Sequence, residues 1–153
     1  MYKCNTSYHL KVLDNSSSLA ISISDSTIGS YTCRVTVKGY KEISSTAKVY
    51  KFGPPKILES TEKIQTGKLR QEASLTCDSF AIPLPDKDIT WTYNKNKIVE
   101  SDRYKINKAA KVDGIVSTLV IKSTLATDFG DYDCSINNGF GEDTLTVRLH
   151  RIG

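Results

Sequence analysis

The stretch Asp128-Phe129-Gly130-Asp131-Tyr132-Asp133-Cys134 decides how this 153-residue sequence folds. Its cysteine lies 57 positions after Cys77, and Trp91 follows that first cysteine by 14 positions. In a two-layer β-sandwich, this spacing allows a disulfide to join strands of the two facing sheets while the tryptophan packs on the bridge. Each feature is weak alone. Together they predict a structural disulfide between Cys77 and Cys134 with Trp91 in the core.

The fold class that this spacing predicts is all-β, an immunoglobulin-like β-sandwich of the I-set type. Alternation of polar and apolar residues predicts strands over 73–77, 88–93, 103–106, 117–121, 131–136 and 144–149. No segment has a sustained period of 3.6 residues, so the sequence predicts no long helix.

A domain boundary is expected at residues 52–55, around Gly53-Pro54-Pro55, because proline cannot donate to a sheet ladder. Residues 53–153 are then one complete domain. Residues 1–52 repeat its latter half, with Gly29-Ser30-Tyr31-Thr32-Cys33 matching the motif that ends at Cys134 and a strand expected at 19–23. Only 32 residues precede Cys33. We therefore expect a truncated domain with strands C to G, in which strands A and B are missing.

The truncation also predicts two free thiols. Met1-Tyr2-Lys3 falls where a strand-C tryptophan is expected, so strand alternation turns Cys4 outward and Cys33 inward. Side chains on opposite faces of a strand pair cannot form a disulfide without backbone movement.

An ion pair and two tyrosine hydroxyls are expected to pin the turns of the sandwich. In this fold an arginine that opens strand D, here Arg103, meets the aspartate of the motif, Asp128. Tyr132 is expected to form a tyrosine corner, with its hydroxyl bonded to upstream backbone, and Tyr31 to do the same in the first part.

Surface features point to an oxidising compartment. Asn5 and Asn15 begin N-glycosylation sequons, which together with a disulfide indicate a secreted or membrane-anchored protein. No run approaches the ~20 apolar residues of a membrane-spanning helix.

The net charge is +4, but aromatic residues are not interleaved with the basic ones, so no nucleic-acid partner is expected. Phe140, in the Asn137-Asn138-Gly139-Phe140 hairpin, is either a contact residue or a packed turn residue.

The sequence favours no enzyme. Neither His9 nor His150 adjoins a nucleophile motif, so no catalytic residues are assigned. No motif of metal-ligand spacing is present and no cofactor or metal is expected, the weak exception being calcium at Asp86–Asp88.

These residues resemble the irre/roughest/Kirre (Neph) branch of the nephrin-related adhesion proteins. The resemblance covers 53–151 well, and 1–52 resembles the second half of the preceding domain. It is carried by Gly53-Pro54-Pro55-Lys56-Ile57, Pro83-Leu84-Pro85-Asp86 before Ile89-Thr90-Trp91, the stretch 114–121, and the stretch from Asp128-Phe129 through Asn138-Gly139-Phe140-Gly141.

The resemblance implies membrane-proximal spacer domains of a single-pass receptor on the extracellular side of the plasma membrane. Its partners would be other immunoglobulin-superfamily adhesion receptors, bound through domains absent here, and its contact with the membrane would run through a transmembrane segment absent here. Two alternatives stay open. One is an intracellular structural I-set module, as in muscle proteins, and the other is the ectodomain of an immunoglobulin-containing receptor kinase.

Overall fold

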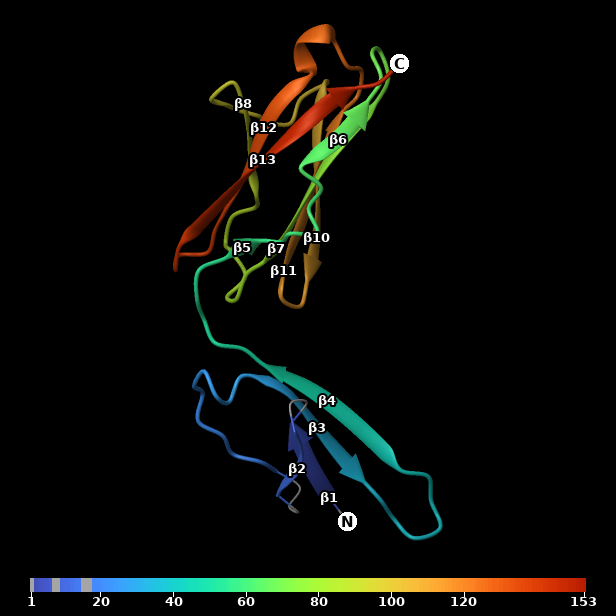
Figure 1. The fold of residues 1–153 in the computed structure, drawn as a ribbon, viewed down its shortest axis with the longest axis vertical. Helices are drawn as coiled ribbons and strands as arrows, with labels where there is room; N and C mark the ends of the chain where they lie inside the picture. Colours follow the sequence, from blue (N-terminus) through green and yellow to red (C-terminus); the bar gives the residue numbers. More distant parts are fainter. Residues whose placement is uncertain (1, 7–8, 15–17) are drawn as a thin grey trace. The chain divides into compact units, whose positions relative to one another are not determined.

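The structure is a computed structural model that describes the backbone of residues 2–6, 9–14 and 18–153 and the side chains of residues 18–153. The chain divides into two compact units, Met1–Lys51 and Phe52–Gly153 (Figure 1). Apart from the three-residue 3-10 helix η1, Ala126–Asp128, every described element is a strand. The predicted all-β class is therefore confirmed. No helix in the described ranges is long and apolar enough to cross a lipid bilayer.

The first unit is a single antiparallel sheet in the order β2-β1-β3-β4. Its strands are β1 (Tyr2–Thr6), β2 (His9–Asp14), β3 (Gly29–Val35) and β4 (Ile43–Val49). No side chain between residues 18 and 51 is buried. The strand expected at 19–23 is absent, because residues 18–23 lie in irregular backbone with no neighbouring strand to pair with.

The expectation of a free thiol at Cys33 is wrong, because Cys33 is disulfide-bonded and exposed. The sheet register explains the error. Backbone pairing sets Cys4 opposite Cys33, the place that Trp91 takes opposite Cys134 in the second unit. The tryptophan position of the first unit is therefore Cys4, three residues after Met1, and the expected alternation is inverted. The Cys4 side chain lies outside the described residues.

The second unit is a sandwich of two sheets that pack face to face (Figure 1). One sheet has the order β10-β11-β7-β5 and the other β6-β13-β12-β8-β9. The strands are β5 (Lys56–Ile57), β6 (Ile64–Gly67), β7 (Ala73–Phe80), β8 (Thr90–Tyr93), β9 (Asn96–Lys97), β10 (Tyr104–Lys111), β11 (Gly114–Ile121), β12 (Gly130–Asn137) and β13 (Glu142–Arg151).

The core lies between these sheets and follows from the alternation in the sequence. In β7 every second residue from Ala73 is buried, and β12 buries Tyr132, Cys134 and Ile136 in the same way. All buried side chains in the described part belong to the second unit. Burial of this apolar surface is its main source of stability, at about 25 cal/mol for each Å² removed from water.

Three strands of the second unit, β5, β6 and β9, were not expected. β6 pairs in parallel with β13, from Ile64 opposite Arg148 to Gly67 opposite Arg151. The short β9 pairs with β8. β6 therefore gives the edge of β13 a partner that lies far away in the sequence.

Candidate functional site

The centre of the second unit is the Cys77–Cys134 disulfide, whose Cα atoms are 6.7 Å apart. Trp91 is fully buried and pairs in register with Cys134. Its indole Nε1 donates a hydrogen bond of 2.9 Å to the Oγ of Ser117, which is also buried. A buried indole N–H without a partner costs free energy, so Ser117 completes the polar pairing of the core.

Substitution of Ser117 by alanine is expected to lower the free energy of unfolding by about 2 kcal/mol, because it strands the indole N–H. Fluorescence of Trp91, the one tryptophan of the sequence, reports the unfolding of this unit in urea. Ser135→Ala is the matched control. The Ser135 Oγ is hydrogen-bonded to the Thr144 Oγ1 on the outer face, so its loss leaves no buried group without a partner. Equal losses for the two variants would contradict the assigned role.

Asp128 lies at one end of the sandwich and gathers three donors. Its Oδ2 accepts 2.6 Å bonds from the Arg103 guanidinium and from the backbone N–H of Leu125, and its Oδ1 accepts the Tyr104 hydroxyl at 3.4 Å. The carboxylate side chain is 4% exposed, whereas the arginine is 44% exposed. The guanidinium also lies 5.3 Å from the centre of the Tyr104 ring. These contacts tie β10 to the turn before β12.

The tyrosine hydroxyls bond to backbone upstream of them in both units. The Tyr132 hydroxyl donates to the carbonyl of Asp128 at 2.7 Å, and the Tyr31 hydroxyl donates to the carbonyl of Thr27 at 2.7 Å. In the second unit the Tyr93 ring stacks on Tyr132 with centroids 4.3 Å apart. The Tyr93 hydroxyl adds a third contact to the same turn, because it donates to the carbonyl of Thr127 at 2.6 Å.

Burial raises the pKa of the Tyr132 hydroxyl far above its usual value, and the nearby Asp128 carboxylate raises it further. The pKa of Tyr104 is also raised, first by burial and then by Asp128. A pKa that is higher in the folded than in the unfolded state gives stability that is present below the unfolded value, about 10 for tyrosine, and is lost as the pH rises above it.

The second unit is therefore expected to lose stability above about pH 10. The free energy of unfolding should fall by about 1.4 kcal/mol per pH unit for each buried tyrosine proton. Urea titrations from pH 8 to pH 11 test this. In Tyr132→Phe, the slope of the free energy of unfolding against pH should be smaller by the contribution of one proton, about 1.4 kcal/mol per pH unit. Tyr40→Phe is the control, because Tyr40 is 80% exposed and lies in the first unit. An unchanged slope in Tyr132→Phe would refute the assignment.

The outer face of β12 and β13 carries polar side chains paired across the two strands, which we call the polar face. Asp131 accepts bonds of 2.7 and 2.8 Å from Arg148, and Asp133 accepts the Thr146 hydroxyl at 2.5 Å. Asp131 is exposed, and its hydrogen bonds from Arg148 lower its pKa. These pairs suit a surface that faces water or a partner rather than a core.

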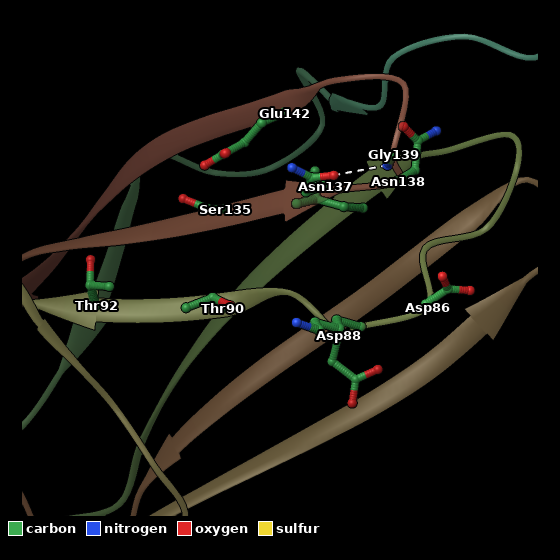
Figure 2. Close-up of a pocket in the computed structure, with 11 residues that line it drawn as sticks. Asp86, Asp88, Thr90, Thr92, Ser135, Asn137, Asn138, Gly139 and Glu142 are labelled. Carbon is green, nitrogen blue, oxygen red and sulfur yellow. Dashed lines mark hydrogen bonds between the residues drawn. The ribbon is translucent and has the colours of Figure 1, made fainter.

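At one end of the polar face lies a groove of about 640 Å³. Figure 2 shows its walls, formed by β8, by the segment before β8 and by the hairpin between β12 and β13. Its lining includes hydroxyls, amides and three carboxylates: Thr90, Thr92, Ser135, Asn137, Asn138, Asp86, Asp88 and Glu142. Within the groove, the Gly139 N–H donates to the Asn137 Oδ1 at 2.8 Å.

The hydroxyls, amides and carboxylates of the groove can form hydrogen bonds and ion pairs with a bound molecule. Among the described residues, no group of three His, Cys, Asp or Glu side chains is placed to hold a metal ion. Asp88, one of the two aspartates weighed for calcium, is paired with Lys108 of β10 at 2.5 Å.

Several expected residues have a definite place, and others do not. Phe140 is 56% exposed, and its ring forms a T-shaped pair with the ring of Phe52, with centroids 5.8 Å apart. Both sequons begin in residues whose side chains lie outside the described part, so glycosylation at Asn5 and Asn15 stays a prediction.

Sequence reasoning missed Ser117 and Asn138. Ser117 carried a signal, since it alternates inward with Leu119 and Ile121, whereas Asn138 was recognised only as a turn residue.

The model of the family described as "Immunoglobulin domain" matches residues 54–138. Together with the two-layer sandwich and its disulfide, this match shows that the chain belongs to the immunoglobulin-domain family. The chain is 33% identical over 141 residues to the Irregular chiasm C-roughest protein of Drosophila melanogaster. It is 30% identical over 142 residues to human Kin of IRRE-like protein 1. These similarities confirm the resemblance to the irre/roughest/Kirre branch.

The matches cover 91% and 90% of this chain, which spans 18% of the length of each relative. Among solved structures, the eight N-terminal immunoglobulin domains of Down Syndrome Cell Adhesion Molecule match 99% of the chain. The TM-score is 0.58, the sequence identity 26%, and the match covers 20% of that chain. Both units therefore share their arrangement of strands with immunoglobulin domains.

Proposed function

We propose that this chain is an extracellular part of a cell–cell adhesion receptor, in which its immunoglobulin units act as spacers that present a distal binding domain. The observation that carries the proposal is the similarity to Irregular chiasm C-roughest protein over 91% of the chain. A known structure of a protein named as an adhesion molecule also matches both units. Its location would be the outer side of the plasma membrane.

The structure supports a spacer role in two ways. The disulfide and the Asp128 contacts hold the core together, so the second unit can act as a rigid spacer. Its polar face is occupied by cross-strand pairs, and the described groove offers binding groups rather than a reaction centre. We therefore propose a protein that is not an enzyme and acts through protein–protein contacts. Its partners would be other immunoglobulin-superfamily receptors.

Secretion and redox state test the proposed location. The 153-residue chain, expressed with a secretion signal in animal cells, should appear in the medium with Cys77 and Cys134 protected from alkylation until a reductant is added. Mass measurement before and after glycosidase shows whether Asn5 and Asn15 carry glycans. Secreted material in which Cys77 and Cys134 are alkylated without reduction would contradict an extracellular protein and favour an intracellular module.

Cell aggregation tests the spacer role. Cells that display the chain alone on a membrane anchor should not aggregate. Cells that display it beneath an unrelated adhesive domain should aggregate as well as cells in which another two-domain immunoglobulin spacer replaces it. Aggregation driven by the chain alone would show that it binds partners itself, and the spacer role would then be wrong.

A further inference from the structure

The segment that follows Phe52 is bonded to the second unit at several points. The Gly53 N–H donates to the carbonyl of Ile82 at 3.0 Å. From the other side, the Asn138 Nδ2 donates to the carbonyl of Gly53 at 2.8 Å and to that of Pro83 at 3.2 Å. One amide of the β12–β13 hairpin thus holds two carbonyls, one from this segment and one from the loop before β8.

The prolines of the segment are also packed against this hairpin. A Cβ atom added to Gly141 would lie 2.7 Å from the Cβ of Pro54, so the prolyl ring lies against the backbone there. Pro55 is buried, and the backbone N–H of Ile57 donates to the Asp143 Oδ2 at 2.7 Å. Proline also fixes its own φ angle. Residues 53–57 are consequently held by packing, hydrogen bonds and covalent restriction together.

Two consecutive residues, Lys51 and Phe52, contact different units. Lys51 pairs with Asp25 of the first unit at 2.8 Å, through side chains that are 56% and 84% exposed. Phe52 instead meets Phe140 of the second unit. Strand β4 has already ended at Val49. An exposed ion pair contributes little to stability, so Lys51 is held far less firmly than Gly53.

We propose that the joint between the two units lies at Lys51–Phe52, and that Gly53-Pro54-Pro55 is a rigid part of the second unit held by Asn138. This location differs from the usual interpretation of a glycine before two prolines as the flexible element of a linker. Gly53 is absent from the residues with positive φ, and a Cβ added to it would meet no atom within 4 Å. The conformation at position 53 therefore does not require a glycine.

Amide ¹⁵N relaxation of the intact chain tests the proposal, because Gly53 is the one residue between Phe52 and Lys56 with a backbone N–H. Its order parameter should match those of β12, about 0.85. Asn138→Asp replaces the amide nitrogen and its two N–H donors by a carboxylate oxygen. That oxygen faces the carbonyls of Gly53 and Pro83 and repels them, so both hydrogen bonds are lost. The order parameter of Gly53 should then fall below about 0.6, and its amide should exchange about tenfold faster.

Asn137→Asp is the matched control. Asn137 is the adjacent asparagine of the hairpin and uses only its Oδ1, as the acceptor for Gly139, so an aspartate keeps that bond. Gly53 should stay rigid in this variant. Asn138→Ala removes the donors without adding charge and should also release Gly53, which keeps the test decisive if Asn138→Asp does not fold.

Gly53→Ala separates the two locations of the joint. If the joint lies at Lys51–Phe52, the residue-53 amide keeps the wild-type order parameter in this variant. A low order parameter for Gly53 in the wild type that rises in Gly53→Ala would place the flexible point at the glycine. That result would overturn the proposal, as would an unchanged Gly53 in both Asn138 variants.

Discussion

Removal of the Cys77–Cys134 disulfide is expected to lower the free energy of unfolding of the second unit by about 4 kcal/mol. The bridge closes a loop of 57 positions between two sheets, so its loss frees the unfolded chain to sample many more conformations. The variant Cys77→Ala/Cys134→Ala, unfolded in urea and followed through Trp91, measures this change. The m-value should also rise, because the unfolded state becomes more expanded.

Wild-type protein in the presence of a reductant gives the comparison for this variant. Its midpoint in urea should shift in the same direction as that of the double alanine variant, with any further loss in the variant due to the cavities left by two buried sulfur atoms. A double variant within about 1 kcal/mol of the oxidised wild type would mean that the sandwich does not depend on the bridge. Such a result would remove the reason for assigning it to an oxidising compartment.

Replacement of Asp128 by alanine is expected to lower the free energy of unfolding by about 3 kcal/mol. The substitution leaves the backbone N–H of Leu125 without its 2.6 Å acceptor and removes the partner of Arg103. Because the guanidinium is partly exposed, water can solvate it, so most of the loss comes from the Leu125 N–H that loses its acceptor and from the loosened turn. Chemical denaturation followed through Trp91 again provides the measurement.

Asp131→Ala is the matched control for Asp128→Ala, since both aspartates belong to the same seven-residue motif. Asp131 pairs with Arg148 on the open surface and should leave the stability nearly unchanged. Arg103→Lys should fall between the two, because a lysine keeps the charge but loses the planar guanidinium. If the two alanine variants were equally stable, the burial of Asp128 would have no energetic consequence.

Much of the second unit could be predicted from the sequence, because its strands bury alternate residues and therefore leave a period of two. The strands around Cys77, Trp91 and Cys134 follow directly from this pattern, as does the disulfide. β6 left no comparable signal. Its residues, Ile64-Gln65-Thr66-Gly67, are few and mixed, and the strand exists only because β13, far along the chain, offers it an edge.

The first unit shows where pattern reasoning fails. The apolar alternation at 19–23 predicts a strand, but a strand also needs a partner, and the described sheet has none beside that segment. The register of Cys33 could not be inferred because a one-residue slip reverses the face of every side chain. The assignment of Met1 to the tryptophan position was displaced by three residues, an odd number, which is enough to invert it.

The candidate site divides in the same way. Residues whose role is set by the common plan of the sandwich, such as Arg103 and Asp128, could be named in advance. Asn138 could not, because its two acceptors come from segments 85 and 55 positions away, and only the folded loops bring them together. The groove beside it likewise combines two separate stretches of the chain, 86–92 and 135–142.

The parallel ladder between β6 and β13 has a mechanical consequence when the second unit is pulled at its two ends. Tension applied to the two ends of the second unit pulls β6 toward its N-terminus and β13 toward its C-terminus, so the strands are loaded in shear along their common axis. The rungs from Ile64–Arg148 to Gly67–Arg151 then share the load and must break together rather than one after another. Under traction, the unit would resist extension through a strand of only four residues.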